Sequence, residues 1–138
     1  MTSSPTFAHS SLLVAAGGGF GAWLRFLTGR AWLAAVGPHA ATAFPWATLT
    51  ANILGSASMG LLAGWLARNG NSGGESWRLL LGVGVLGGYT TFSAFALEFA
   101  VFVERGALAT AALYTAVSLL AGIGALFGGL WLMRGVLA

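Results

Sequence analysis

Residues 87–95 read GGYTTFSAF and lie inside a long apolar segment, residues 77–103. Paired glycines followed by β-branched threonines are poor helix formers. The pattern therefore predicts a break at residues 87–91, near the middle of the segment. If the segment crosses a membrane, non-helical backbone at that depth is tolerated only where it is buried in protein or lines a polar cavity. A simpler alternative is a glycine kink with the Thr and Ser hydroxyls bonded back to the chain.

The composition of the whole chain indicates a bilayer environment. Of its 138 residues, 57% are hydrophobic and 7% are charged, whereas a soluble domain usually has about 25% charged residues. Four apolar segments are each long enough to cross about 30 Å of hydrocarbon as a helix. They are residues 11–36, 46–67, 77–103 and 107–133. We therefore predict an all-α membrane protein with four transmembrane helices in a single domain, residues 1–138, with the third helix broken at mid-membrane.

Several function classes are disfavoured by the residues present. The chain has no Cys, so disulfides, thiolate metal sites and cysteine nucleophiles are excluded. His9 and His39 have no neighbouring ligands, and the GVGVLG run at residues 82–87 lies in an apolar segment without the strand that a dinucleotide fingerprint needs. With none of these constellations present, we do not predict an enzyme. The six arginines are scattered singly, so we do not predict nucleic-acid binding either. The tail up to Ser11 has no Arg or Lys, so we expect the first span to be retained rather than cleaved as a signal peptide.

Small and aromatic residues follow the expected spans. Glycines spaced four apart occur in each one: Gly17 and Gly21, Gly60 and Gly64, Gly84 and Gly88, and Gly124 and Gly128. This spacing lets helix backbones approach closely. Tryptophans lie near the span ends, where membrane interfaces favour them: Trp32, Trp46, Trp65, Trp77 and Trp131. We therefore predict tightly packed helices with aromatic residues at both interfaces.

The distribution of arginines barely favours either orientation of the chain in the membrane. Arg68, Arg78 and Arg134 fall on one predicted side, and Arg30 and Arg105 on the other. The positive-inside rule therefore barely favours either insertion. Two oppositely inserted copies would form an antiparallel pair related by a two-fold axis in the membrane plane. We treat this antiparallel dual-topology homodimer as a hypothesis.

Polar residues at similar depth could line a track through the spans. Asn52 lies in the second span, Glu98 lies beyond the break, and Tyr114 and Ser118 share a face of the fourth. Asn52 could equally serve as an interhelical hydrogen-bonding residue. Glu98 is the one acidic residue well inside a span, and an arginine partner would be its structural explanation. Arg25 could snorkel to the interface, attract anions or brace a dimer.

Phe92 and Phe95 are three residues apart, and so lie on one face beside the break. Ordinary packing or lipid-facing aromatics are the simpler interpretation. In the functional interpretation, the positive ring edges face a small anion without trapping it.

Three motifs together resemble the signatures of the Fluc (CrcB-type) fluoride channels. They are GFGAWLR at residues 19–25, TLTANILG at residues 48–55 and GGYTTFSAF at residues 87–95. The resemblance implies a fluoride-selective channel that passively exports fluoride from the cytoplasm and protects the cell from fluoride toxicity. It also implies a multi-pass protein of the cell (inner or plasma) membrane that works as an antiparallel dual-topology homodimer with two pores.

The resemblance also implies roles for individual residues. Main-chain carbonyls of Gly87 and Thr90 from both subunits would hold a structural sodium ion at the dimer interface. The pore would be lined by Phe92, Phe95, Asn52, Ser93, Tyr114 and Ser118. A polar track or anion vestibule would include Glu98, Thr91 and Arg25.

Two positions depart from that family pattern, and two other classes compete with it. Ala94 stands where the family usually has threonine, and Gly122 stands where some members carry a second pore serine. A four-span multidrug exporter would need an exchangeable carboxylate, usually in the first span, which here has Arg25 and no acid. A packing subunit without transport would explain the glycine spacing, but not the polar residues at the level of the break.

Overall fold

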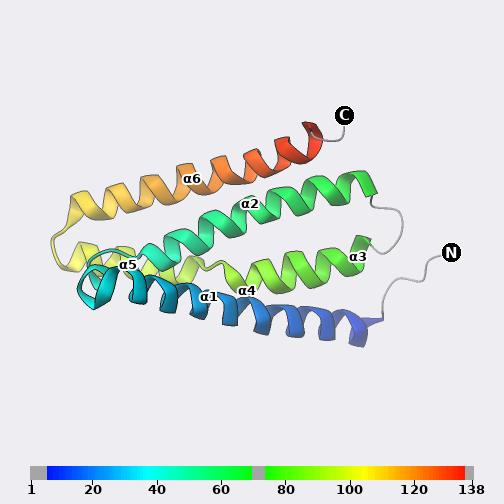
Figure 1. Cartoon of the computed structure of the whole chain (residues 1–138), viewed down its shortest axis with the longest axis horizontal. Coiled ribbons are helices and arrows are strands. Elements are labelled where there is room, and N and C mark those ends of the chain that lie inside the picture. The colour runs from blue at the N-terminus through cyan, green and yellow to red at the C-terminus, as the bar shows by residue number, and fades with distance from the viewer. Residues whose placement is uncertain (1–5, 70–73, 136–138) are drawn as a thin grey trace.

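The computed structural model describes residues 6–69 and 74–135, and these residues form helices joined by short connections. Four helical segments are long and apolar enough to cross a membrane: α1 (Phe7–Ala43), α2 (Trp46–Asn69), the third segment (Gly74–Glu104) and α6 (Leu108–Gly135). They lie side by side with their long axes roughly aligned (Figure 1). The predicted all-helical class with four helices of membrane-spanning length is confirmed.

The first helix is longer than the sequence pattern predicted. It begins at Phe7, where the hydroxyl of Thr6 accepts a hydrogen bond from the His9 N–H at 3.4 Å. Gly37 leaves the helical conformation, with φ 79° and ψ 167°, a region that glycine tolerates because it has no Cβ. Pro38 then starts a further helical stretch to Ala43, as its fixed φ permits at a first helical position. Gly37 therefore separates two helical stretches of α1, residues 7–36 and 38–43, at the turn that the sequence predicted.

The third segment consists of several short elements. They are α3 (Gly74–Trp77), the π-helical η1 (Arg78–Leu86), α4 (Gly87–Tyr89) and α5 (Phe92–Glu104). Thr90 (φ −79°, ψ 158°) and Thr91 (φ −154°, ψ 121°) are extended between α4 and α5. The π-helical stretch was not predicted; π-helix is rare in proteins and frequently lies at functional sites. The depth of the extended residues in a bilayer stays a prediction.

Glycines let the helices approach closely in two places. On α1, a Cβ added to Gly21 would collide with the carbonyl oxygen of Val85 in η1. On α2, a Cβ at Gly60 would collide with the carbonyl oxygen of Leu126 in α6. These contacts join α1 to the third segment and α2 to α6, the two most extensive helix pairs.

The glycine pair on α6 does not behave like the others. Neither Gly124 nor Gly128 has a described atom within 4 Å of an added Cβ. The close approach to α2 is made instead by Gly129, which faces the carbonyl oxygen of Ala57. The i, i+4 spacing therefore indicated the right kind of contact but the wrong face of α6.

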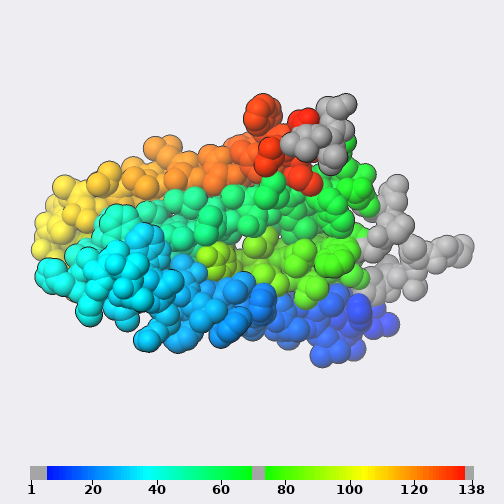
Figure 2. Space-filling model, in the orientation of Figure 1, coloured from blue at the N-terminus to red at the C-terminus, as the bar shows by residue number. Residues whose placement is uncertain are grey.

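Little of the apolar surface is buried within one chain. Its buried hydrophobic cluster consists of Leu49, Phe102, Ala111 and Tyr114, while Trp131 is 76% exposed. Such exposure is expected where lipid or another chain covers the helices. In the space-filling view α2 and α6 run together along one edge and α1 runs along the other (Figure 2). The third segment is visible in a hollow between α1 and α2.

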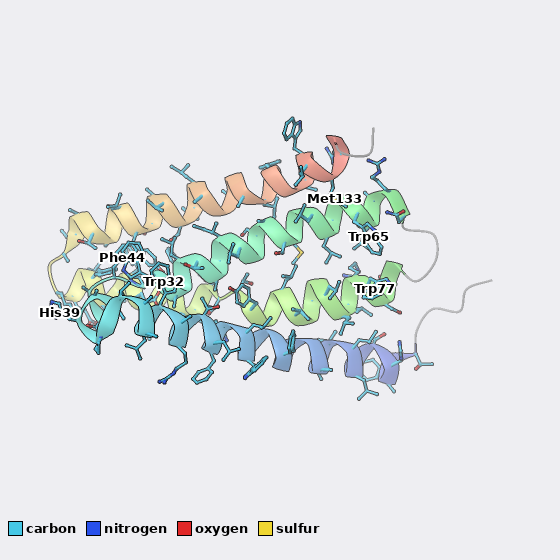
Figure 3. All side chains as sticks on the ribbon, in the orientation of Figure 1. Trp32, His39, Phe44, Trp65, Trp77 and Met133 are labelled. Carbon is cyan, nitrogen blue, oxygen red and sulfur yellow. The ribbon has the colours of Figure 1, made fainter. Side chains whose placement is uncertain are left out.

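Aromatic residues gather near both ends of the bundle. Trp32 and Phe44 lie near one end, and Trp65 and Trp77 lie near the other (Figure 3). The Trp65 and Trp77 rings meet edge to face with centroids 6.3 Å apart. This arrangement matches the aromatic belts of membrane proteins.

Candidate functional site

The extended residues between α4 and α5 are held by side chains from two other helices. A guanidinium nitrogen of Arg25, Nη1, donates to the Thr90 carbonyl at 3.1 Å. The Asn52 amide accepts from the Thr91 N–H at 2.8 Å and donates to the Thr91 carbonyl at 3.0 Å. Backbone groups that leave a helix inside a protein need new partners. Here Arg25 of α1 and Asn52 of α2 supply them.

Thr91 also starts the following helix. Its hydroxyl oxygen accepts from the Ala94 N–H at 3.2 Å, which is an N-cap contact, and lies 3.3 Å from the Ser93 hydroxyl. Caps of this kind satisfy one of the free donors at a helix start. Only the backbone of Ala94 takes part in this cap.

The two phenylalanines lie beside this start. The ring centroids of Phe92 and Phe95 are 5.7 Å apart, and the ring planes are tilted by 41°. Phe95 also packs on Tyr114 with centroids 5.1 Å apart, whereas Phe92 is 77% exposed. The Phe95 ring therefore packs within the chain, and the Phe92 ring projects from it.

Glu98 is tied to two helices by short hydrogen bonds. Its Oε1 accepts from the Thr48 hydroxyl at 2.6 Å, and its Oε2 accepts from the Tyr114 hydroxyl at 2.6 Å. Tyr114 is fully buried. The Glu98 carboxylate is thus held by hydroxyl donors, and no arginine pairs with it among residues 6–69 and 74–135.

Sequence reasoning missed Thr48 as a site residue. It lies on α2 four residues before Asn52 and so on the same helical face. That spacing was the available signal. Thr48 and Glu98 line a cavity of about 320 Å³ that also has Trp32 and Arg105 in its wall. Arg25 is not among its lining residues, so the cation at this cavity is Arg105, which the sequence did not single out.

Two further grooves contain some of the other predicted polar residues. One, of about 300 Å³, is lined by Asn52, Thr90, Thr91 and Phe92 together with parts of α2 and α6. The other, of about 410 Å³, lies between α2 and α6 and includes Ser118. The Ser118 hydroxyl oxygen is buried and has no hydrogen-bond partner among the described residues. The three hollows therefore contain only part of the predicted site. Glu98, Asn52, Thr90, Thr91, Phe92 and Ser118 line them, whereas none of the three is lined by Gly87, Phe95, Ser93, Tyr114 or Arg25.

The backbone carbonyls at the interruption have the right chemistry for a hard cation. Since the Thr91 N–H donates to Asn52, it is not available to the Gly87 carbonyl, its usual helical acceptor. The Thr90 carbonyl accepts from Arg25 and keeps a second lone pair. Carbonyl oxygens suit such cations, so Gly87 and Thr90 fit the donor type, although the guanidinium adds positive charge beside them. No cluster of three or more His, Cys, Asp or Glu side chains occurs in the described residues.

Four membrane-length helices with polar hollows beside an interrupted segment are features of a small multi-pass channel. The family model for CrcB-like protein, Camphor Resistance (CrcB), matches residues 12–130. The chain therefore belongs to the CrcB-like family, which the three sequence motifs indicated.

Curated relatives support the same assignment and cover nearly the whole chain. A protein of Novosphingobium aromaticivorans is 59% identical over 127 residues, which are 92% of this chain and 98% of its own length. A protein of Phenylobacterium zucineum is 52% identical, and one of Caulobacter vibrioides 48% identical, each covering 92% of this chain and 97% of its own length. All three are named Fluoride-specific ion channel FluC. The family is one of channels, and the chain is not an enzyme.

Proposed function

We propose that this chain is a subunit of a fluoride channel that lets fluoride leave the cytoplasm passively and so protects the cell from fluoride toxicity. The observation that carries the proposal is the 59% identity, over 92% of the chain, to a protein named Fluoride-specific ion channel FluC. The cell (inner or plasma) membrane is the setting that fits this role.

The chemistry of the hollows supports passage of a small anion. Fluoride is strongly hydrated, so a selective pathway must replace its water with donors and still release it. Hydroxyl and amide donors are present at Asn52, Ser93 and Ser118. The Tyr114 hydroxyl donates to Glu98 in this structure and would have to turn to donate to a passing ion. The tilted rings of Phe92 and Phe95 add positive edges without a full charge. Thr91 and Glu98 continue the polar track, with Arg25 near its centre.

A passive route out of the cell is sufficient for protection. Fluoride enters acidified cells as neutral HF and dissociates in the cytoplasm. The anion then leaves down its concentration gradient and the membrane potential. Export therefore needs no nucleotide.

The proposed working unit is an antiparallel dual-topology homodimer with a structural sodium ion. One chain offers two suitable carbonyls, Gly87 and Thr90, and a second copy would complete the ligand set around a two-fold axis. Bound there, the sodium would supply fixed positive charge at the centre of the dimer. The 77% exposed Phe92 ring would then be covered by the partner. The balanced arginine distribution supports insertion in both orientations.

Fluoride efflux from liposomes containing the purified protein tests this function. We expect rapid fluoride release and no comparable release of chloride from the same vesicles. Folded protein that releases no fluoride would refute the proposal. Cross-linking of single-cysteine variants, detected from both sides of the vesicle, separately tests dual topology. Replacing sodium with a large organic cation during purification tests the proposed sodium site, because loss of sodium should reduce fluoride flux or dimer stability.

A further inference from the structure

Two of the polar hollows adjoin on α2. The groove at the extended residues contains Asn52, Thr91 and Phe92, and the groove between α2 and α6 contains Ser118. Ser56 and Leu126 line both. Ser56 is four residues after Asn52, and so lies one helical turn further along the same face of α2. It is the one polar side chain of the described residues common to the two grooves.

The hydroxyls in these grooves differ from others on the same helices. Thr28 and Thr115 each donate to the carbonyl four residues earlier, at 3.0 Å and 2.9 Å. That is the usual way for a hydroxyl on a membrane helix to satisfy itself. The buried Ser118 hydroxyl has no such partner within the described residues, nor does the Ser56 hydroxyl. An unpaired buried hydroxyl is costly unless water or an ion occupies the space beside it.

Gly122 leaves room opposite Ser56. A Cβ added to Gly122 would lie 3.7 Å from the Ser56 hydroxyl oxygen, an ordinary van der Waals contact. The Ser56 hydroxyl therefore occupies the space that a polar side chain at position 122 would otherwise reach. Gly122 is one turn beyond Ser118 on α6, so a donor here continues the row of Tyr114 and Ser118.

We propose that Ser56 is a fluoride-contacting residue whose hydroxyl links the groove at Asn52 to the groove at Ser118. This inference rests on the proposed function and adds a donor on α2 to a row otherwise carried by α6. The hydroxyl replaces part of the water that fluoride loses between Asn52 and Ser118. The open space at Gly122 makes the Ser56 hydroxyl accessible to an ion. The same space allows a serine at position 122 to be used as a test of the role of Ser56.

The test measures fluoride efflux from liposomes for wild type, Ser56→Ala, Ser58→Ala and the double variant Ser56→Ala with Gly122→Ser. Alanine suits a helix well, so Ser56→Ala should fold. We expect Ser56→Ala to slow efflux about tenfold, the effect of one lost hydrogen bond in the rate-limiting passage. Ser58, exposed on another face of α2, serves as the matched control and should be unaffected. The double variant should recover most of the flux, because it restores a hydroxyl in the same space.

The outcomes separate the inference from the proposed function. If wild type itself releases no fluoride, the proposed function fails. If wild type and Ser56→Ala release fluoride equally fast, the function stands and the role of Ser56 is refuted. Ser56→Ala could instead show slow fluoride efflux together with a lowered melting temperature, and the double variant could fail to recover the flux. That result would make Ser56 a structural residue and would also overturn the inference.

Discussion

The side-chain amide of Asn52 forms two hydrogen bonds with the backbone of Thr91, accepting from its N–H at 2.8 Å and donating to its carbonyl at 3.0 Å. One residue of α2 therefore satisfies both backbone groups of the extended residue before α5. An amide nitrogen carries two hydrogens, and the second remains for another acceptor. Asn52 thus has the interhelical role that the sequence allowed, and its second N–H is available for the proposed role in the pore.

Asn52→Asp should reduce fluoride efflux by at least about tenfold. A carboxylate cannot donate to the Thr91 carbonyl, and its charge repels an approaching anion. Efflux from liposomes and the melting temperature in detergent measure the two effects. Asn69→Asp is the control, because Asn69 lies at the exposed end of α2, where its side-chain amide donates to the Trp65 carbonyl of the same helix. Unchanged efflux in Asn52→Asp would exclude Asn52 from the pathway.

Phe92→Ile and Phe95→Ile should each abolish most fluoride efflux while leaving the protein folded. Isoleucine keeps apolar bulk but removes the positive ring edge. Phe95→Ile should also lower the melting temperature, since that ring packs on Tyr114 at 5.1 Å, whereas the exposed Phe92 should tolerate the change within one chain. Phe26→Ile, on the exposed surface of α1, is the control. Full efflux in both variants would exclude the aromatic role.

Arg25→Gln should destabilise the protein by about 1.5–3 kcal/mol, the typical contribution of a hydrogen bond from a charged group. The lost bond is the one from the guanidinium to the Thr90 carbonyl. Thermal unfolding in detergent measures the loss of stability. Arg30→Gln is the control, because Arg30 is exposed on the same helix. If Thr90 also binds sodium, the variant should need less sodium for full stability, because a nearby positive charge is gone. Identical melting of Arg25→Gln and wild type would show that this bond contributes nothing.

Gly21→Ala should lower stability by about 1–3 kcal/mol or more, as overpacking usually does. Its new methyl group would meet the backbone carbonyl of Val85, which cannot move without shifting η1. Gly19→Ala is the matched control two residues earlier, where no described atom lies within 4 Å of an added Cβ. Alanine there should be neutral or stabilise α1 by up to about 1 kcal/mol through helix propensity. Equal melting temperatures for the two variants would contradict the close α1–η1 contact.

Much of the helical framework could be predicted from sequence because hydropathy and backbone propensity are local properties. Apolar runs indicated the four long helices, and Gly37 with Pro38 indicated a backbone change that does occur at Gly37. Propensity could not show that helix resumes after Pro38. Likewise, the spacing of Gly124 and Gly128 could not show which face of α6 meets α2, because that depends on the rotation of the whole helix.

The sequence by itself determined the membrane class, the four spans, and the candidate polar and aromatic residues of the family motifs. Only the tertiary structure decided their partners: Arg25 meets the Thr90 carbonyl across 65 residues, and Thr48 meets Glu98 across 50. It also brought Ser56 and Ser118 to one groove. The physical reason is that a buried polar group is satisfied by whatever the packing brings within about 3 Å, and packing is set by all four helices together.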